Sequence, residues 1–153
     1  MQKDQWDEAM QAAVAGCLEN MAFMEVFPAE PDAPEPEDPV WVSLLVLEPT
    51  QGEFRLALSR ALLEEIAANI YGFDSEITEQ QTADLLAELL NTILGRFMAS
   101  ILPMETFKLG IPEAGTTEWP PIEPDALHWH FTAEEHSLSI IASGAPMLQL
   151  CKH

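Results

Sequence analysis

Four polar or small residues recur along residues 84 to 98 (DLLAELLNTILGRFM) at spacings of four, three and four. They are Asp84, Glu88, Asn91 and Gly95. In an α-helix each residue turns by about 100°, so these positions fall within about 60° of arc and form one straight stripe. A carboxylate and a carboxamide one turn apart, above a glycine that leaves space, have the chemistry of a small reaction platform.

The opposite arc of this predicted helix is apolar, and it carries Leu85, Leu86, Leu89, Leu90, Ile93, Leu94 and Phe97. Such an arc packs on a core, so the stripe is predicted to face outward. A solvated helix face has the same pattern, and this interpretation stays open for the helix taken alone. Asn and Gly, however, cost roughly 0.5–0.7 and about 1 kcal/mol relative to Ala inside a helix. Two such residues on one exposed stripe favour a functional role.

Length and composition indicate one globular domain spanning residues 1–153, because 48% of the residues are hydrophobic. The N-terminus lacks the pattern of a signal peptide, and the apolar run 40–47 is too short to cross a bilayer. Cys17 and Cys151 lie near opposite ends of the chain, as expected of reduced thiols. We therefore expect a cytoplasmic protein.

The charge balance is extreme, with 26 acidic against 6 basic residues and a net charge of −20. Nucleic acids and anionic membranes are bound through Lys and Arg, so this surface repels both. It favours a partner that presents a basic patch.

The first half of the chain predicts helices around one β-hairpin. A helix is expected over 5–26, followed at 28–39 by a surface loop with five prolines and five acids. Strands over 40–47 and 53–58 form the hairpin. Ser59 is the expected N-cap of a second helix that ends at Gly72. The capping box Thr78-x-x-Gln81 opens the long helix, which ends before Pro103.

The second half predicts strands over 106–111, 126–132 and 137–143, with a last edge strand over 146–151. The fold class is therefore α+β, with an antiparallel sheet of about five to six strands and helices packed on one face. The element order is α-β-β-α-α-β-β-β.

This element order, with Asp84, Glu88 and Asn91 on its third helix, resembles the CheC/CheX/FliY family of chemotaxis phosphatases. The family motif is Asp or Ser, three residues, Glu, two residues, Asn, and a proline a little over twenty residues on. Pro112 lies slightly closer to Asn91 than that pattern places it. The first helix has only the adjacent pair Glu19-Asn20 and lacks the motif spacing. The chain is therefore most similar to the CheX type, which has a single site.

The resemblance implies hydrolysis of the aspartyl phosphate of a CheY-type response regulator in chemotaxis signalling. Asn91 would orient the attacking water, and Glu88 would form a salt bridge with the lysine beside the regulator's phosphoryl group. Asp84, Gly95 and Pro112 would contact the partner. The protein would need no cofactor of its own, since Mg²⁺ is expected in the regulator. The family also implies a homodimer, joined through sheet edges that we expect in the C-terminal strands.

Two other functions remain open at this stage. The same helix in a non-catalytic module would bind a regulator or a flagellar-switch component without accelerating hydrolysis. An acidic interaction protein, such as a nucleic-acid mimic, would not need Asn91 at all.

A metal site at His128 and His130 is a weaker alternative, because an alternating strand with Trp129 turned inward explains their spacing. No G-x-S-x-G elbow and no glycine-rich phosphate loop occurs.

Overall fold

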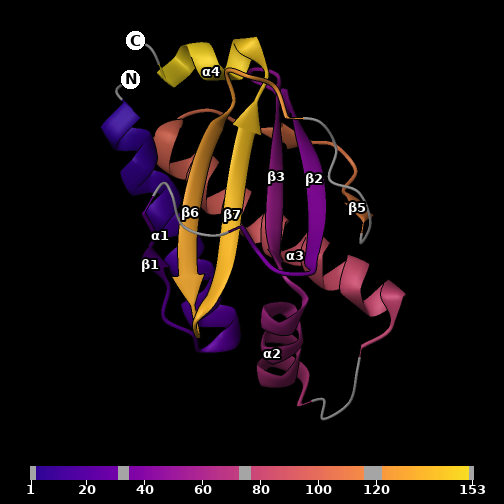
Figure 1. The fold of residues 1–153 in the computed structure, drawn as a ribbon. Helices are drawn as coiled ribbons and strands as arrows, with labels where there is room; N and C mark the ends of the chain where they lie inside the picture. Colours follow the sequence, from indigo (N-terminus) through magenta and orange to yellow (C-terminus); the bar gives the residue numbers. More distant parts are fainter. Residues whose placement is uncertain (1–2, 31–34, 73–76, 116–121, 152–153) are drawn as a thin grey trace.

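The computed structural model, which describes residues 3–30, 35–72, 77–115 and 122–151, contains one antiparallel sheet with two long helices across one face (Figure 1). The elements in chain order are α1 (Lys3–Ala22), β1 (Phe27–Pro28), β2 (Pro39–Glu48), β3 (Gly52–Ser59), α2 (Arg60–Tyr71), α3 (Glu79–Ile101), β4 (Lys108–Leu109), β5 (Glu113–Gly115), β6 (Leu127–Ala133), β7 (His136–Ser143) and α4 (Ala145–Cys151).

The sheet is built from the two predicted hairpins, β2–β3 and β6–β7, which join through β3 and β7. The strand order is β1-β6-β7-β3-β2-β4, and β5 also pairs with β2. Helices α1 and α3 lie behind the sheet as it is viewed in Figure 1, while α2 and α4 lie at its two ends. The predicted α+β class is confirmed, and the described residues form seven strands rather than five or six.

Helix boundaries follow the predicted capping signals. The Ser59 side chain accepts a hydrogen bond from the Leu62 amide, and α2 ends at Gly72 with a φ of 72°. The Thr78 and Gln81 side chains form the capping box that starts α3. The long helix therefore begins where the sequence places it.

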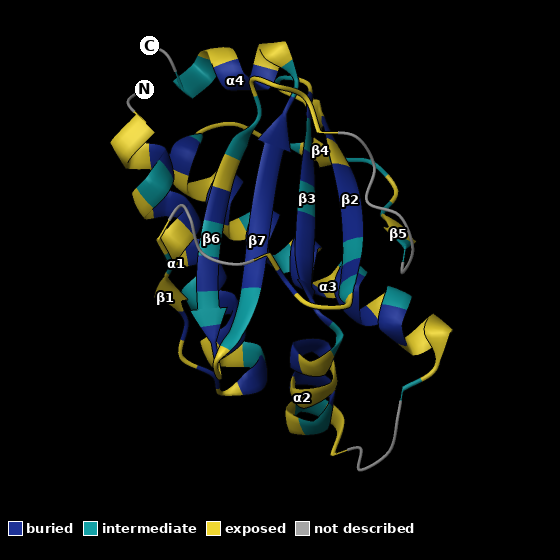
Figure 2. Cartoon of the chain, viewed as in Figure 1, coloured by how far each residue is buried: buried dark blue, intermediate teal, exposed yellow. Residues whose placement is uncertain are grey.

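The core lies between the sheet and the α1–α3 layer, where the buried side chains are concentrated (Figure 2). Phe97 of α3 packs edge-on against Trp6 of α1, with ring centroids 5.2 Å apart, and against Phe54 of β3 at 5.7 Å. Trp129 of β6 stacks on Trp6 at 6.5 Å. These contacts join both helices to both hairpins, so the rotation of α3 about its axis is fixed.

Two predicted strands in the second half of the chain differ in the structure: one is wrong and one is shorter. Residues 146–151 belong to helix α4 instead of an edge strand. Gly144, with a φ of 102°, turns the chain after β7, and Pro146 lies in the first helical turn, where its missing amide hydrogen costs nothing. The strand predicted over 106–111 shortens to Lys108–Leu109.

The N-terminal segment also differs from its prediction. Helix α1 ends at Ala22 rather than residue 26, because Phe23 has a left-handed φ of 58°. In the predicted loop at 28–39, Pro28 belongs to β1 and Pro39 begins β2, while residues 31–34 lie outside the described ranges.

The predicted edge among the C-terminal strands is found in part. Strand β7 lies inside the sheet, and β6 is followed by β1. Strand β1 covers only Phe131 and Thr132 of β6, and at the other edge the two-residue β4 and the three-residue β5 pair with β2. A hydropathy search of the described helices finds none with the length and apolarity of a membrane span.

Candidate functional site

The predicted stripe lies on the outward face of α3. Asp84, Glu88 and Asn91 are exposed, and Gly95 is half-buried. Within the described residues, the side chains of Glu88 and Asn91 have no hydrogen bond or ion pair. Both groups are therefore available to a partner molecule.

The apolar arc of α3 is buried as predicted: Leu85, Leu86, Leu89, Leu90, Ile93, Leu94 and Phe97 are each at most 1% exposed. A helix anchored by seven buried side chains has little freedom to roll. The sheet and the core thus hold the Glu88 and Asn91 backbone in a fixed direction, which positioning chemistry requires.

The N-terminal part of the stripe is held locally. The Gln80 amide Nε2 donates to Oδ1 of Asp84 over 2.8 Å, one helical turn away. The capping box begins two residues before Gln80 and fixes the first turn. Asp84 is therefore already partly satisfied by a neighbour, unlike Glu88.

Gly95 leaves open space at the other end of the stripe. A Cβ built at Gly95 would meet no atom within 4 Å. Packing within the described residues therefore does not require glycine at this position.

Pro112 is half-buried and stands directly before β5. Strand β5 pairs with β2 through Trp41, Val42 and Ser43, and it also contacts α3. The sheet therefore brings the proline segment close to α3.

Cys17 of α1 lies behind the stripe, in the contact between α1 and α3. Its Sγ is 3.8 Å from the carbonyl oxygen of Leu89 and 3.6 Å from the sulfur of Met21. Burial raises the pKa of Cys17 to about 12, against a smaller lowering by Arg96 and a raising by Glu88. The thiol stays protonated and is not a nucleophile at neutral pH.

Sequence reasoning missed Arg96, which follows Gly95 on α3. The guanidinium of Arg96 lies against Gly16 of α1, where a Cβ would come within 2.6 Å of its Nη1 atom. The only signal in the sequence was a rare cation next to the stripe in a strongly acidic chain. The pairing with Gly16 joins residues 80 positions apart, which no local pattern reveals.

The two histidines of β6 lie side by side on one face of the strand. The rings of His128 and His130 stack with centroids 6.1 Å apart, and His130 Nδ1 lies 3.0 Å from the Ser139 hydroxyl. Trp129 between them is buried, as the alternation predicts. No group of three His, Cys, Asp or Glu side chains with metal-binding geometry occurs among the described residues.

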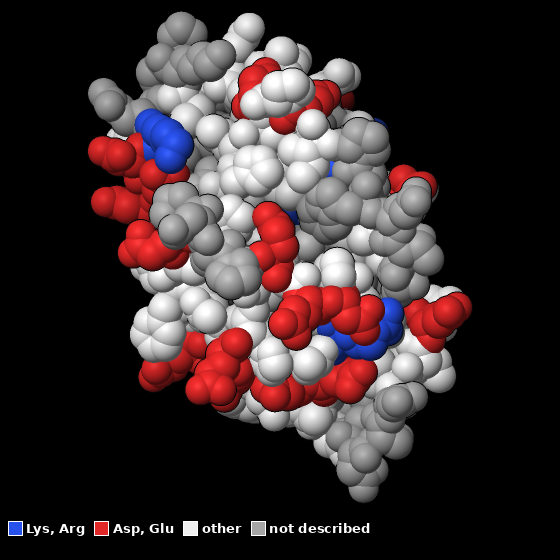
Figure 3. Space-filling view, viewed as in Figure 1, with Lys and Arg blue, Asp and Glu red and all other residues white. Residues whose placement is uncertain are grey.

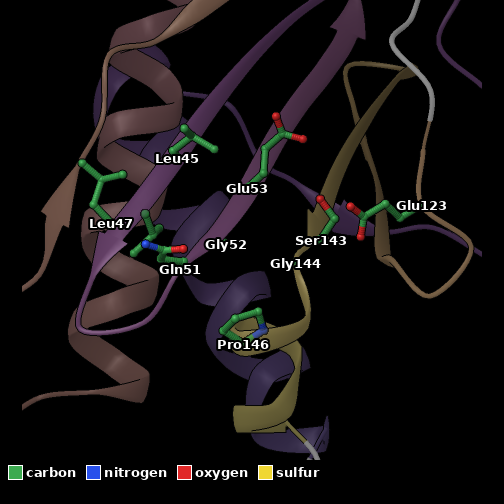
Figure 4. Close-up of a pocket in the computed structure, with 10 residues that line it drawn as sticks. Leu45, Leu47, Gln51, Gly52, Glu53, Glu123, Ser143, Gly144 and Pro146 are labelled. Carbon is green, nitrogen blue, oxygen red and sulfur yellow. The ribbon is translucent and has the colours of Figure 1, made fainter.

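Two cavities lie away from the stripe. The first, of about 530 Å³, is lined by Leu45, Leu47, Glu53 and Ser143 on the sheet and by Pro146 of α4 (Figure 4). Leu45 and Glu53 alternate with buried residues that face the helices, so this cavity opens on the opposite face of the sheet. It contains none of the predicted site residues.

The second is a cleft of about 710 Å³ near α2, lined by seven carboxylates together with Arg60 and His136. Figure 3 shows carboxylates gathered across this part of the surface. Crowded like charges of this kind disfavour an anionic ligand such as a phosphate.

The family model "Chemotaxis phosphatase CheX" matches residues 45–126, which include all of α3 and Pro112. No curated protein matches the sequence.

Solved structures share the fold at low identity. The chemotaxis protein CheX of Vibrio vulnificus has a TM-score of 0.74 and 19% identity, covering 90% of this chain and 94% of that chain. A CheX–CheY–BeF₃–Mg²⁺ complex of Borrelia burgdorferi has a TM-score of 0.67 and 15% identity, covering 89% and 95%. Thermotoga maritima FliY has a TM-score of 0.67 and 17% identity, covering 99% and 96%.

Proposed function

The chain belongs to the CheX family of chemotaxis phosphatases, and on this premise we propose that it hydrolyses the aspartyl phosphate of a CheY-type response regulator. The observation that carries the proposal is the pair Glu88 and Asn91, exposed and unpaired on a rigidly packed helix. The pair lies within the part of the chain that matches the family.

In the proposed reaction, water attacks the phosphorus and the bond between phosphorus and the aspartyl oxygen breaks. The regulator recovers its carboxylate, and inorganic phosphate leaves with the oxygen and protons of the water. Such transfers are accelerated mainly by positioning and electrostatics, so no covalent intermediate on this protein is needed. Mg²⁺ belongs to the regulator's pocket in this proposal, and this chain contributes no metal.

Asn91 is the proposed water-positioning residue. Its carbonyl oxygen accepts a hydrogen bond and its amide group donates, so it fixes both the place and the orientation of one water without changing protonation. Orienting one water in line with the bond that breaks is worth on the order of 10²-fold in rate.

Glu88 is proposed to bind the lysine that a response regulator holds beside its phosphoryl group. It projects about 60° around the helix axis from Asn91 and one turn before it, so both side chains enter one pocket of a partner. The exposed Glu88 carboxylate has no hydrogen bond or ion pair among the described residues, so it is available to such a lysine.

Asp84, Gly95 and Pro112 are proposed to form the rest of the contact surface. Gly95 allows the partner to approach α3 closely, since no atom fills its open side. This substrate implies a cytoplasmic protein, and by family we also propose a homodimer.

The test is the decay of phosphate on a CheY-type regulator, measured with wild-type protein, Asn91→Ala and Ser100→Ala. Ser100 is an exposed polar residue of the same helix outside the stripe, so it controls for surface truncation. We expect the wild type and Ser100→Ala to accelerate decay, and Asn91→Ala to lose about 10²-fold while still binding the regulator.

The alternative of a non-catalytic binding module predicts a different outcome. If complexes form but the wild type does not change the decay rate, the binding module is correct. If no regulator forms a complex, the proposed function is wrong.

A further inference from the structure

Arg96 is one of two cations, with Lys108, that have no ion pair among the described residues. Lys3, Arg55 and Arg60 each form an ion pair with a carboxylate of the same chain. Arg96 is exposed and has no ion pair or hydrogen bond within the described residues. In a chain with a net charge of −20, an arginine left without an internal carboxylate partner is available to an external one.

The side chain of Arg96 lies against helix α1. Its Nη1 atom would be 2.6 Å and its Cζ atom 3.3 Å from a Cβ on Gly16, so the guanidinium rests where that side chain is missing. Gly16 sits inside α1, where glycine is unfavourable. Glycine at this position makes room for the Arg96 side chain across the seam between α1 and α3.

Helix geometry places Arg96 beside the proposed site rather than in it. Arg96 follows Glu88 by eight residues, about 12 Å along the axis, and projects about 80° away from it around the helix. It projects about 140° away from Asn91. A phosphoryl group over Asn91 is therefore out of its reach, whereas a protein docked on α3 covers roughly 800 Å² and extends over the α1–α3 seam.

We propose that Arg96, seated on Gly16, is a specificity-determining residue that forms an ion pair with a surface carboxylate of the phosphorylated regulator. The inference rests on the proposed function and adds a second point of recognition to it. Because the chain repels acidic proteins overall, one correctly placed cation raises the association rate and selects regulators with an acid at the facing position.

The test compares Arg96→Glu with Lys108→Glu in steady-state dephosphorylation of a CheY-type regulator. Lys108 of β4 is the matched control, since it too is exposed and unpaired within the described residues and its reversal changes the net charge equally. At 50 mM NaCl we expect Arg96→Glu to raise KM about tenfold with kcat unchanged, and Lys108→Glu to stay within about twofold. At 500 mM NaCl the Arg96→Glu effect should fall below about threefold.

A second variant tests whether the position of the Arg96 guanidinium affects KM when its charge is kept. Gly16→Ala keeps Arg96 but puts a methyl group 2.6 Å from its Nη1 atom, so the guanidinium must shift. We expect KM to rise while the melting temperature stays equal or increases, since alanine favours a helix. In an Arg96→Gln background, Gly16→Ala should have no further effect on KM.

The outcomes distinguish the two proposals. Suppose that the wild type is active but the KM of Arg96→Glu equals that of Lys108→Glu, or that Arg96→Glu lowers kcat instead of raising KM. The proposed role of Arg96 is then wrong, while the proposed phosphatase activity is unaffected. If the wild type neither binds nor dephosphorylates a regulator, the proposed function is wrong and the inference falls with it.

Discussion

Burial sets the pKa of Cys17, a residue of α1 that lies behind the stripe. Its pKa is raised from 9.0 to about 12, chiefly by burial, with Arg96 lowering it and Glu88 raising it less. The folded state therefore keeps the thiol proton that the unfolded state loses above pH 9. This contribution to stability is complete below pH 9 and is lost as pH rises toward 12.

The corresponding prediction concerns alkaline unfolding. Between pH 9 and 11, the free energy of unfolding of the wild type should fall more steeply than that of Cys17→Ala, by up to about 1.4 kcal/mol per pH unit. Denaturant titrations at each pH measure the two slopes. Parallel slopes for the wild type and Cys17→Ala would contradict the prediction.

The stripe on α3 was predictable from the sequence, but the contact between Arg96 of α3 and Gly16 of α1 was not. The exposure of Glu88 and Asn91 follows from the 3.6-residue period, which is a local property. The contact between Arg96 and Gly16 depends on how α1 and α3 cross, and it requires the packed core. Local patterns therefore found the proposed chemistry but missed this proposed recognition element.

At the scale of the helix, two substitutions at Gly95 test the stability of α3 and the docking of the regulator independently. No atom lies within 4 Å of a Cβ at this position, so Gly95→Ala should stabilise α3 by about 1 kcal/mol. A bulky Gly95→Phe should keep the fold but raise the regulator's KM at least tenfold, because the ring occupies the space the partner needs.

Two measurements check the Gly95 prediction together. Chemical denaturation gives the stability of both variants, and steady-state kinetics with a phosphorylated regulator gives KM. Wild-type KM for Gly95→Phe would show that no partner approaches this end of the stripe.

Secondary structure was predicted well where each element has its own local signals. The caps at Ser59 and Thr78 set the starts of α2 and α3, and both hairpins appear as expected. The short elements were predicted poorly because they lack local signals of their own. Strand β1 exists only because Phe27 and Pro28 pair with β6, about a hundred residues away, and α4 has only seven residues to show a period.

At the scale of the whole molecule, charge opposes self-association. Two copies that each carry −20 repel one another, and salt screens that repulsion. The short outer strands β1, β4 and β5, of two or three residues, offer few backbone groups for pairing between copies, whereas β6 is paired with β1 only at Phe131 and Thr132. A homodimer must therefore be held together against electrostatic repulsion.

The proposed homodimer should consequently strengthen with salt, which is the reverse of the Arg96-dependent binding of the regulator. We expect sedimentation equilibrium to give twice the chain mass of 17.0 kDa, with a dissociation constant several-fold lower at 500 mM than at 50 mM NaCl. A monomer at every protein and salt concentration would contradict the homodimer. A dimer that weakens with salt would instead require ion pairs between copies, and one of the few cations, such as Arg96 or Lys108, would then have to lie in the interface.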